Sequence, residues 1–340
     1  MNLKFGIEVS PLPNKTKSVF LAIEESGFDT VWMGDHFLPW SNIDAERLPY
    51  INYMSLVYLP LILSYTSKIK VGPCVLCPLF RYHPAIVAQY FAQLDWTFPG
   101  RVILGLGTGE KINEYPIVGF WPNLKERRER LVEAVKIIRM LWENKDFFDF
   151  DGQYYRLKNV KLYVRPKQKI PIIVSAGGSQ MAKIAGEIGD GVMAFVAESG
   201  EVKNKIIDPF YESLKKSGKK IEEAEVYLYT VGGIVDEKIL PKILKGLKRT
   251  ASFIHGEAFK QYDPREVDKV TINIPEDVLF KKTLFVTSVD DLISRIEEYF
   301  KVGVNHLVVS DLTSVLEGKT NGISEIWKRK IIPYFVSKKF

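Results

Sequence analysis

The sequence predicts a single-domain α/β fold, a (β/α)8 TIM barrel in which eight parallel strands alternate with helices. Short β-branched runs alternate along the chain with longer segments that carry apolar residues at three- and four-residue spacing. The runs are almost continuously apolar, which is typical of parallel strands because they are buried on both faces. A length of 340 residues is sufficient for one such barrel.

Each predicted element follows from this alternation. The apolar runs predict strands over residues 4–9, 30–33, 70–76, 101–106, 170–175, 191–195, 225–235 and 306–310. Helical spacing predicts helices over residues 15–26, 84–98, 124–142, 181–189 and 289–302. Because no repeat, low-complexity tract or linker divides the chain, we expect residues 1–340 to form one domain.

Three connections are longer than a barrel requires, at residues 107–123, 145–169 and 236–284. Long connections in a compact domain usually carry function. In the second of them, the pair Asp151 and Gly152 predicts a β-hairpin. We expect all three connections to be insertions within the one domain.

The composition excludes several classes of protein and partner. With 46% hydrophobic and 26% charged residues, the chain is neither collagen-like nor disordered. The net charge of +6 is spread over short runs such as residues 216–220, so it does not predict nucleic-acid binding. The longest apolar stretch, residues 51–65, contains polar residues and is shorter than the ~18 residues of a membrane span.

The compartment is predicted from the N-terminus and the cysteines. A strand is expected within three residues of Met1, which leaves no room for a secretion signal. Two cysteines in a chain of this length also do not indicate a disulfide scaffold. We therefore expect a cytoplasmic protein whose partner is a small molecule.

Several side chains that can carry chemistry directly follow the predicted strands, and the active site of such a barrel forms at the carboxyl ends of its strands. His36 and Trp40 follow the second strand, Glu110 follows the fourth, and Gly177 and Gly178 follow the fifth. We expect these residues to share one rim of the barrel, where they would form the active site.

His36 is the first candidate catalytic residue. Its imidazole has an unperturbed pKa of about 6.5, so it can take or give a proton near neutral pH. The alternative is a histidine that caps the loop beneath Asp35. Trp40 lies four residues further on and either contacts the substrate or packs in the mouth of the barrel.

Glu110 ends a glycine-rich loop that matches a dinucleotide-binding fingerprint only in part. It stands where the third glycine should be, and we expect no helix directly behind it, so we exclude a Rossmann site. The glycines would let the backbone approach a flat ligand, with Glu110 aimed at a ring heteroatom. The alternative is a flexible loop with a solvated glutamate.

The Gly177–Gly178 pair precedes a predicted helix, where free amide groups and the helix dipole favour an anion. A turn from strand to helix also needs glycine for its geometry alone, so both interpretations stay open.

Two further motifs are expected to be structural. Cys74 and Cys77 are the only cysteines, so they cannot complete a tetrahedral zinc site, and we expect no metal. Residues three apart on a strand face opposite sides, so a disulfide between them is not expected. The charged run 125–130 is typical of a solvated helix face with i,i+3 and i,i+4 pairs rather than of a binding motif.

Six segments taken together resemble one family. They are Asp-His-Phe-Leu-Pro-Trp at 35–40, Pro-Leu-Phe-Arg-Tyr-His-Pro at 78–84, Gly-Thr-Gly-Glu-Lys-Ile-Asn-Glu at 107–114, Phe-Asp-Gly-Gln-Tyr-Tyr-Arg-Leu at 150–157, Ala-Gly-Gly at 176–178 and Gly-Asp-Gly at 189–191. Over nearly its whole length the chain resembles the bacterial luciferase-like superfamily of (β/α)8 barrels, in the branch that uses the deazaflavin coenzyme F420. Within this branch it is most similar to the glucose-6-phosphate dehydrogenases.

The resemblance implies a reaction and a set of roles. A substrate carbinol carbon would give a hydride to C5 of the deazaflavin, His36 would handle the hydroxyl proton, and Glu110 would serve the proton at ring nitrogen N1. Trp40 would orient the substrate and stabilise the developing charge. The resemblance also implies a cis peptide bond between Cys74 and Val75, and a homodimer. The cofactor contacts carried over by position are Asp35, Cys74, Val75, Cys77, Thr108, Gly109, Asn113, Gly177, Gly178, Gln180 and Met181.

The chain differs from the family at the positions that bind the sugar phosphate in the glucose-6-phosphate dehydrogenases. The family's threonine corresponds to Phe195 and a lysine to Ser199, while a second lysine and an arginine fall only near Lys260 and Lys282. Together with Trp40, these are the candidate substrate contacts. Because these charges are not all retained, a sugar phosphate and a neutral secondary alcohol both remain possible substrates.

Two other functions stay open. One is an FMN-dependent monooxygenase on the same barrel, and the other is a non-catalytic flavin-binding protein. The joint presence of His36, Trp40 and Glu110 favours the F420-dependent dehydrogenase.

Overall fold

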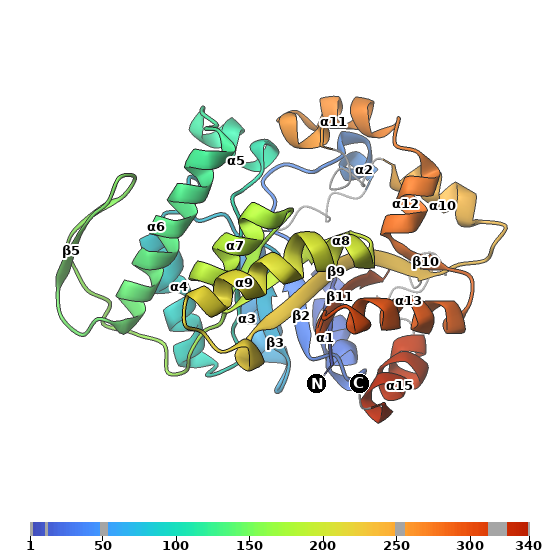
Figure 1. Ribbon diagram of the computed structural model, residues 1–340, viewed down its shortest axis with the longest axis horizontal. Coiled ribbons are helices and arrows are strands. Elements are labelled where there is room, and N and C mark those ends of the chain that lie inside the picture. Colours follow the sequence, from blue (N-terminus) through green and yellow to red (C-terminus); the bar gives the residue numbers. More distant parts are fainter. Residues whose placement is uncertain (1–2, 11–12, 48–53, 249–255, 312–324, 339–340) are drawn as a thin grey trace.

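The centre of the molecule is a barrel of parallel strands (Figure 1). The structure, a computed structural model, describes residues 3–10, 13–47, 54–248, 256–311 and 325–338. Eight strands follow one another in the order β3-β2-β1-β11-β9-β8-β7-β4. Isolated bridges from Val71 to Val102 and from Leu76 to Leu106 connect the two ends of this order, which confirms the predicted barrel. The strands are β1 Lys4–Glu8, β2 Thr30–Met33, β3 Lys70–Pro73, β4 Leu104–Leu106, β7 Ile172–Ser175, β8 Gly191–Phe195, β9 Glu225–Ile234 and β11 His306–Asp311.

The five predicted helices are present, and their ends differ from the prediction by at most two residues. They are α1 Thr16–Glu25, α4 Pro84–Thr97, α6 Leu124–Glu143, α7 Ser179–Ile188 and α13 Val289–Lys301. Sequence periodicity did not predict α3 Ser55–Tyr65, because this helix is apolar on all sides and contains Pro60. No helix in the described part of the chain is both long and apolar enough to cross a membrane. The other α-helices in the described part of the chain are α2 Asn42–Arg47, α5 Lys111–Val118, α8 Ser199–Val202, α9 Asp208–Lys216, α10 Leu240–Leu247, α11 Pro264–Thr271, α12 Glu276–Lys282 and α15 Ile332–Ser337.

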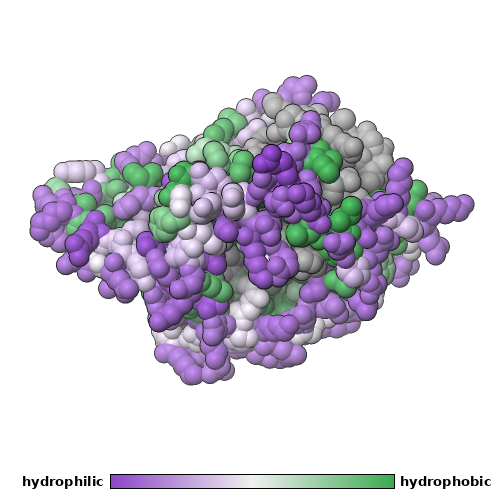
Figure 2. Space-filling view, turned by 90° about the horizontal axis from the view of Figure 1, so that it is seen from above, coloured by the Kyte–Doolittle hydropathy of each residue, from purple (hydrophilic) through white to green (hydrophobic). Residues whose placement is uncertain are grey.

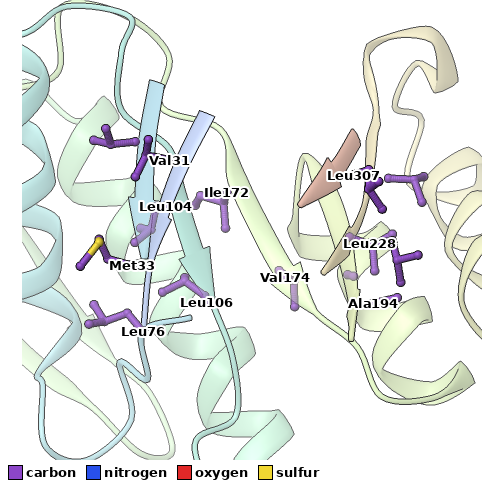
Figure 3. Close-up of a cluster of buried hydrophobic side chains, with 14 of the residues drawn as sticks. Val31, Met33, Leu76, Leu104, Leu106, Ile172, Val174, Ala194, Leu228 and Leu307 are labelled. Carbon is purple, nitrogen blue, oxygen red and sulfur yellow. The ribbon is translucent and has the colours of Figure 1, made fainter. Parts of the chain in front are cut away.

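The strands bury both of their faces, as their continuous apolar runs predicted. Alternate residues such as Trp32, Met193 and Tyr227 fill the inside of the barrel. Their neighbours along each strand, for example Val31 and Leu228, point outward into the layer between the barrel and its helices (Figure 3). Packing on both faces holds the strands in place, and with them the loops at their carboxyl ends, where the candidate active site lies.

The three predicted insertions carry structure of their own. Residues 145–169 contain the hairpin β5 Phe148–Asp151 and β6 Arg156–Val160, although its connection spans residues 152–155 rather than a turn centred on Asp151 and Gly152. Residues 236–284 hold α10, α11 and α12, and residues 249–255 of this insertion lie outside the described chain. A short strand, β10 Leu284–Val286, then pairs with β9.

The first insertion corrects one prediction. Helix α5 begins at Lys111, directly after Glu110, where we expected no helix. The apolar period of this helix is interrupted by Pro116 and by the buried polar side chains of Asn113 and Glu114. The sequence pattern therefore did not predict a helix here. The exclusion of a Rossmann site still holds because β4 belongs to a barrel.

Candidate active site

A cavity of about 560 Å³ lies at the carboxyl ends of the strands. Figure 2 looks onto this end of the barrel from above, where hydrophilic side chains dominate and hydrophobic ones form small groups between them. The cavity brings together most of the residues that the sequence predicted for the site. The predicted residues that line it are Asp35, His36, Cys74, Val75, Cys77, Thr108, Gly109, Glu110, Asn113, Gly177, Phe195 and Lys282.

Asn113 joins the two candidate catalytic side chains. Its carbonyl oxygen Oδ1 accepts hydrogen bonds from the backbone amides of Phe37, at 2.8 Å, and Leu38, at 3.2 Å. This fixes the amide nitrogen Nδ2 on the other side, 2.8 Å from Glu110 Oε2 and 3.2 Å from His36 Nδ1. Nδ1 and Oε2 are therefore only 4.0 Å apart, although they come from two different barrel loops.

The cavity shifts the pKa values of both groups away from their ordinary values. Burial lowers the pKa of His36 to about 4, and the charge of Arg81 contributes to this, while Asp35 opposes it. The predicted ordinary histidine pKa near 6.5 is therefore wrong for this site. Burial also raises the pKa of Glu110 to about 7, against the hydrogen bond from Asn113. At neutral pH the histidine is therefore uncharged, and the raised pKa keeps part of the glutamic acid protonated.

The orientation of Asn113 predicts the tautomer of His36. Because Nδ2 is a donor, Nδ1 of the neutral ring must accept, and the ring proton lies on Nε2. Nitrogen-15 NMR of the imidazole should show this tautomer near pH 7, with His36→Gln identifying the signal. In Asn113→Asp, a carboxylate replaces the amide, so we expect the proton to move to Nδ1 and the pKa of His36 to rise. A wild-type ring protonated at Nδ1 would contradict this assignment.

A charged cluster beneath these residues holds the two loops together. Arg81 donates from Nη2 to Asp35 Oδ2 at 2.7 Å and from Nε to Glu114 Oε1 at 3.3 Å. The other oxygen of Asp35 accepts from the backbone amide and hydroxyl of Ser55. Asp35 thus lies in the cavity wall, but both oxygens of its carboxylate already accept hydrogen bonds from Arg81 and Ser55.

Close packing explains the glycines that precede Glu110. A Cβ at Gly109, whose φ is +77°, would lie 2.5 Å from Cys77 Sγ, and a Cβ at Gly107 would lie 2.8 Å from Val75 Cγ2. These glycines let the loop after β4 lie directly against the chain after β3. Both cysteines are free thiols, and the peptide bond between Cys74 and Val75 is cis, as the family resemblance implied.

Arg127 corrects the interpretation of the charged run 125–130 as a purely solvated face. The pairs Lys125–Glu129 and Glu126–Arg130 follow the predicted spacing, but Arg127 lines the cavity with its guanidinium 4.1 Å from the centre of the Trp121 ring. Its Nε atom is buried and has no hydrogen-bond partner. A buried donor without a partner in a cavity wall fits an anionic ligand group.

Six predicted site residues lie outside the cavity wall. Trp40 packs edge-on against Phe259, with 5.4 Å between ring centroids. Of these two residues, Phe259 and not Trp40 lines the cavity. The others are Gly178, Gln180 and Met181 around the start of α7, Ser199 at the start of α8, and Lys260, which forms an exposed ion pair with Glu257.

Some of the cavity residues were not predicted. Arg81 and Glu114 lay within the matched segments, but neither had a role before their contacts were seen. Glu201 and Lys205 follow β8 and show only an ordinary i,i+4 charge pair in the sequence. Among the described residues there is no group of three histidine, cysteine or carboxylate side chains that could hold a metal ion.

Comparison with known proteins agrees with the predicted family. The chain matches the luciferase-like monooxygenase family over residues 8–306. It is 35% identical over 293 residues to the F420-dependent glucose-6-phosphate dehydrogenase of Amycolatopsis mediterranei (strain U-32), which covers 84% of each chain. Its structure is similar to that of an F420-dependent secondary alcohol dehydrogenase in complex with an F420-acetone adduct, with a TM-score of 0.87, 30% identity and coverage of 95% of this chain and 97% of that chain. The coenzyme F420 dependent tetrahydromethanopterin reductase from Methanopyrus kandleri gives a TM-score of 0.75 at 25% identity, with 98% of this chain and 100% of that chain covered. The chain therefore belongs to the luciferase-like monooxygenase family, together with members named for their dependence on coenzyme F420.

Proposed function

We propose that this protein is an F420-dependent dehydrogenase that transfers a hydride between a carbinol carbon and C5 of the deazaflavin. The observation that carries the proposal is the pair of proton-handling groups, His36 and Glu110, that Asn113 holds at one end of the barrel cavity. The relatives named above are F420-dependent enzymes, and two of them are dehydrogenases of alcohols or sugar phosphates.

The two groups suit the two protons of such a reaction. The bound deazaflavin would supply a two-electron hydride acceptor. His36 would take the hydroxyl proton of the alcohol, for which its uncharged ring is available above about pH 4. Glu110, with a pKa of about 7, would hold a proton for ring nitrogen N1.

Asn113 lies between the two groups that would handle these protons. In the tautomer assigned above, Nδ1 holds the lone pair that accepts from Asn113 Nδ2. For Nε2 to take the alcohol's proton, the ring proton must therefore move to Nδ1 and the hydrogen bond from Asn113 must be given up. Glu110 Oε2, 4.0 Å from Nδ1, is the carboxylate oxygen beside that position. We therefore expect proton transfer at His36 to depend on the protonation state of Glu110.

An anionic tail of the cofactor would find donors along the wall between α6 and α7. Gly177 lines the cavity, and a Cβ there or at Gly178 would meet no atom within 4 Å, so the chain leaves room at this helix start. Arg127 lines the same cavity, and its buried Nε has no hydrogen-bond partner. A phosphodiester would satisfy both the guanidinium and the free amides at the start of α7.

Replacing Arg127 by glutamine should weaken F420 binding by about tenfold or more, because a hydrogen bond to a charged group contributes about 1.5–3 kcal/mol. A fluorescence titration of the purified protein measures this directly. Arg130→Gln is the matched control, since Arg130 lies on the same helix and pairs with Glu126. Equal dissociation constants for the wild type and Arg127→Gln would place the tail elsewhere.

The proposed function is tested by incubating the protein with oxidised F420 and a panel of secondary alcohols and sugar phosphates, and following the loss of the cofactor's visible absorbance. We expect reduction with at least one substrate and binding of F420 at least about tenfold tighter than binding of FMN, equal to about 1.4 kcal/mol. Oxygen-dependent turnover with reduced FMN and none with F420 would instead indicate a monooxygenase. Binding without turnover would indicate a non-catalytic protein.

A further inference from the structure

A second charged group lies in the wall of the same cavity. It connects α8 with the end of α12, two helices that lie near each other in Figure 1. Glu201 of α8 bridges two lysines there. Its Oε1 is 2.9 Å from Lys205 Nζ, one turn further along the chain, and its Oε2 is 3.1 Å from Lys282 Nζ at the end of α12. We call these three residues the bridged lysine pair.

The bridged lysine pair is part of the substrate cavity and not of the outer surface alone. All three residues line the cavity that also holds His36 and Glu110. The side chains of Glu201 and Lys282 are 33% and 26% exposed and so are partly buried, whereas that of Lys205 is 60% exposed. The wall of this cavity also carries hydrophobic side chains, among them Phe195 and Ile206.

Glu201 is held as an anion at this position. The hydrogen bond from Lys205 lowers the pKa of Glu201, and Lys282 adds to this effect, so the carboxylate is charged at neutral pH. Each of its oxygens faces one ammonium group. The two lysines would form a site of charge +2 without Glu201, and with it the cluster carries only +1.

A phosphate dianion cannot use these lysines without a cost. It would either displace the carboxylate, which then loses both partners within the cavity, or bind beside it and experience like-charge repulsion. An uncharged alcohol meets no such penalty, because it needs only the hydrophobic wall and the proton-handling groups.

We propose that Glu201 is a specificity-determining residue, which occupies the anion-binding lysines and restricts the enzyme to uncharged secondary alcohols in place of phosphorylated sugars. This inference rests on the proposed function above and names its substrate class. It also predicts that the phosphate-binding capacity of the lysines is present in the chain but blocked.

Removing the charge of Glu201 tests this proposal. In Glu201→Gln, the ratio of kcat/KM for glucose 6-phosphate to kcat/KM for a secondary alcohol should rise at least about tenfold over the wild type. Inorganic phosphate should inhibit alcohol oxidation competitively at a concentration at least about tenfold lower than in the wild type. The matched control is Glu212→Gln, which breaks the exposed i,i+4 pair with Lys216 outside this cavity and should change neither value.

A double variant shows whether the effect passes through the lysines. Glu201→Gln combined with Lys282→Gln should lose the gained sensitivity to phosphate. The proposal is overturned if the wild type prefers glucose 6-phosphate to every alcohol, or if Glu201→Gln leaves phosphate inhibition unchanged. No reduction of F420 by either substrate class would contradict the proposed function, whereas calorimetric titration of Glu201→Gln with phosphate would still report on the lysines.

Discussion

Replacing His36 by alanine should lower the rate of hydride transfer from a bound alcohol by about 10²-fold or more, while F420 affinity stays within a few-fold. The hydride leaves readily only as the hydroxyl proton departs, and the ring of His36 borders the cavity in its uncharged form. Stopped-flow mixing of the F420-loaded enzyme with alcohol, followed by the cofactor's absorbance, measures this step separately from cofactor binding.

Two further measurements separate proton transfer from simple hydrogen bonding. His36→Gln keeps an amide donor but cannot take a proton, so its rate should lie close to that of His36→Ala. Since burial lowers the pKa of His36 to about 4, the wild-type rate should also show no acidic limb between pH 5 and pH 7. A His36→Gln enzyme with nearly wild-type turnover, or a wild-type rate that falls below about pH 6.5, would contradict the proposed role.

The barrel could be predicted from the sequence because each strand is buried on both faces and therefore apolar along its whole length. The predicted strands at 70–76 and 101–106 are longer than β3 and β4 for a physical reason. Leu76 and Val102 are buried apolar residues, yet they form only isolated bridges and not a continuous ladder. The prediction read buried apolar residues as strand residues, so it made both strands longer than the segments that are hydrogen-bonded as strands.

The site was predictable where residues directly follow a strand, as His36, Glu110 and Gly177 do. It was less predictable where a side chain reaches the cavity from a helix. Arg127 belongs to a run whose charge spacing is that of a solvated helix, and only the packing of α6 turns this residue toward Trp121 and the cavity. The shifted pKa values likewise depend on burial that no sequence spacing records.

The second large effect is expected at Glu110. Glu110→Gln keeps the size of the side chain and its place beside Asn113 but cannot supply a proton, so hydride transfer should slow by about 10²- to 10⁴-fold. F420 affinity should change by no more than a few-fold, because the proposed role is proton transfer and not anchorage. The same stopped-flow experiment measures the rate, and a fluorescence titration measures the affinity.

The role of Glu110 as an acid predicts the direction in which the rate changes with pH. Burial raises the pKa of Glu110 to about 7, so the acid that must protonate N1 is present below this pH and is lost above it. Alcohol oxidation in the wild type should therefore decline as the pH rises through about 7, and Glu110→Gln should lack this decline. If the variant instead lost its cofactor and kept full turnover when saturated with F420, Glu110 would be a binding residue. A decline that persisted unchanged in Glu110→Gln would assign the titrating group to another part of the complex, such as the cofactor.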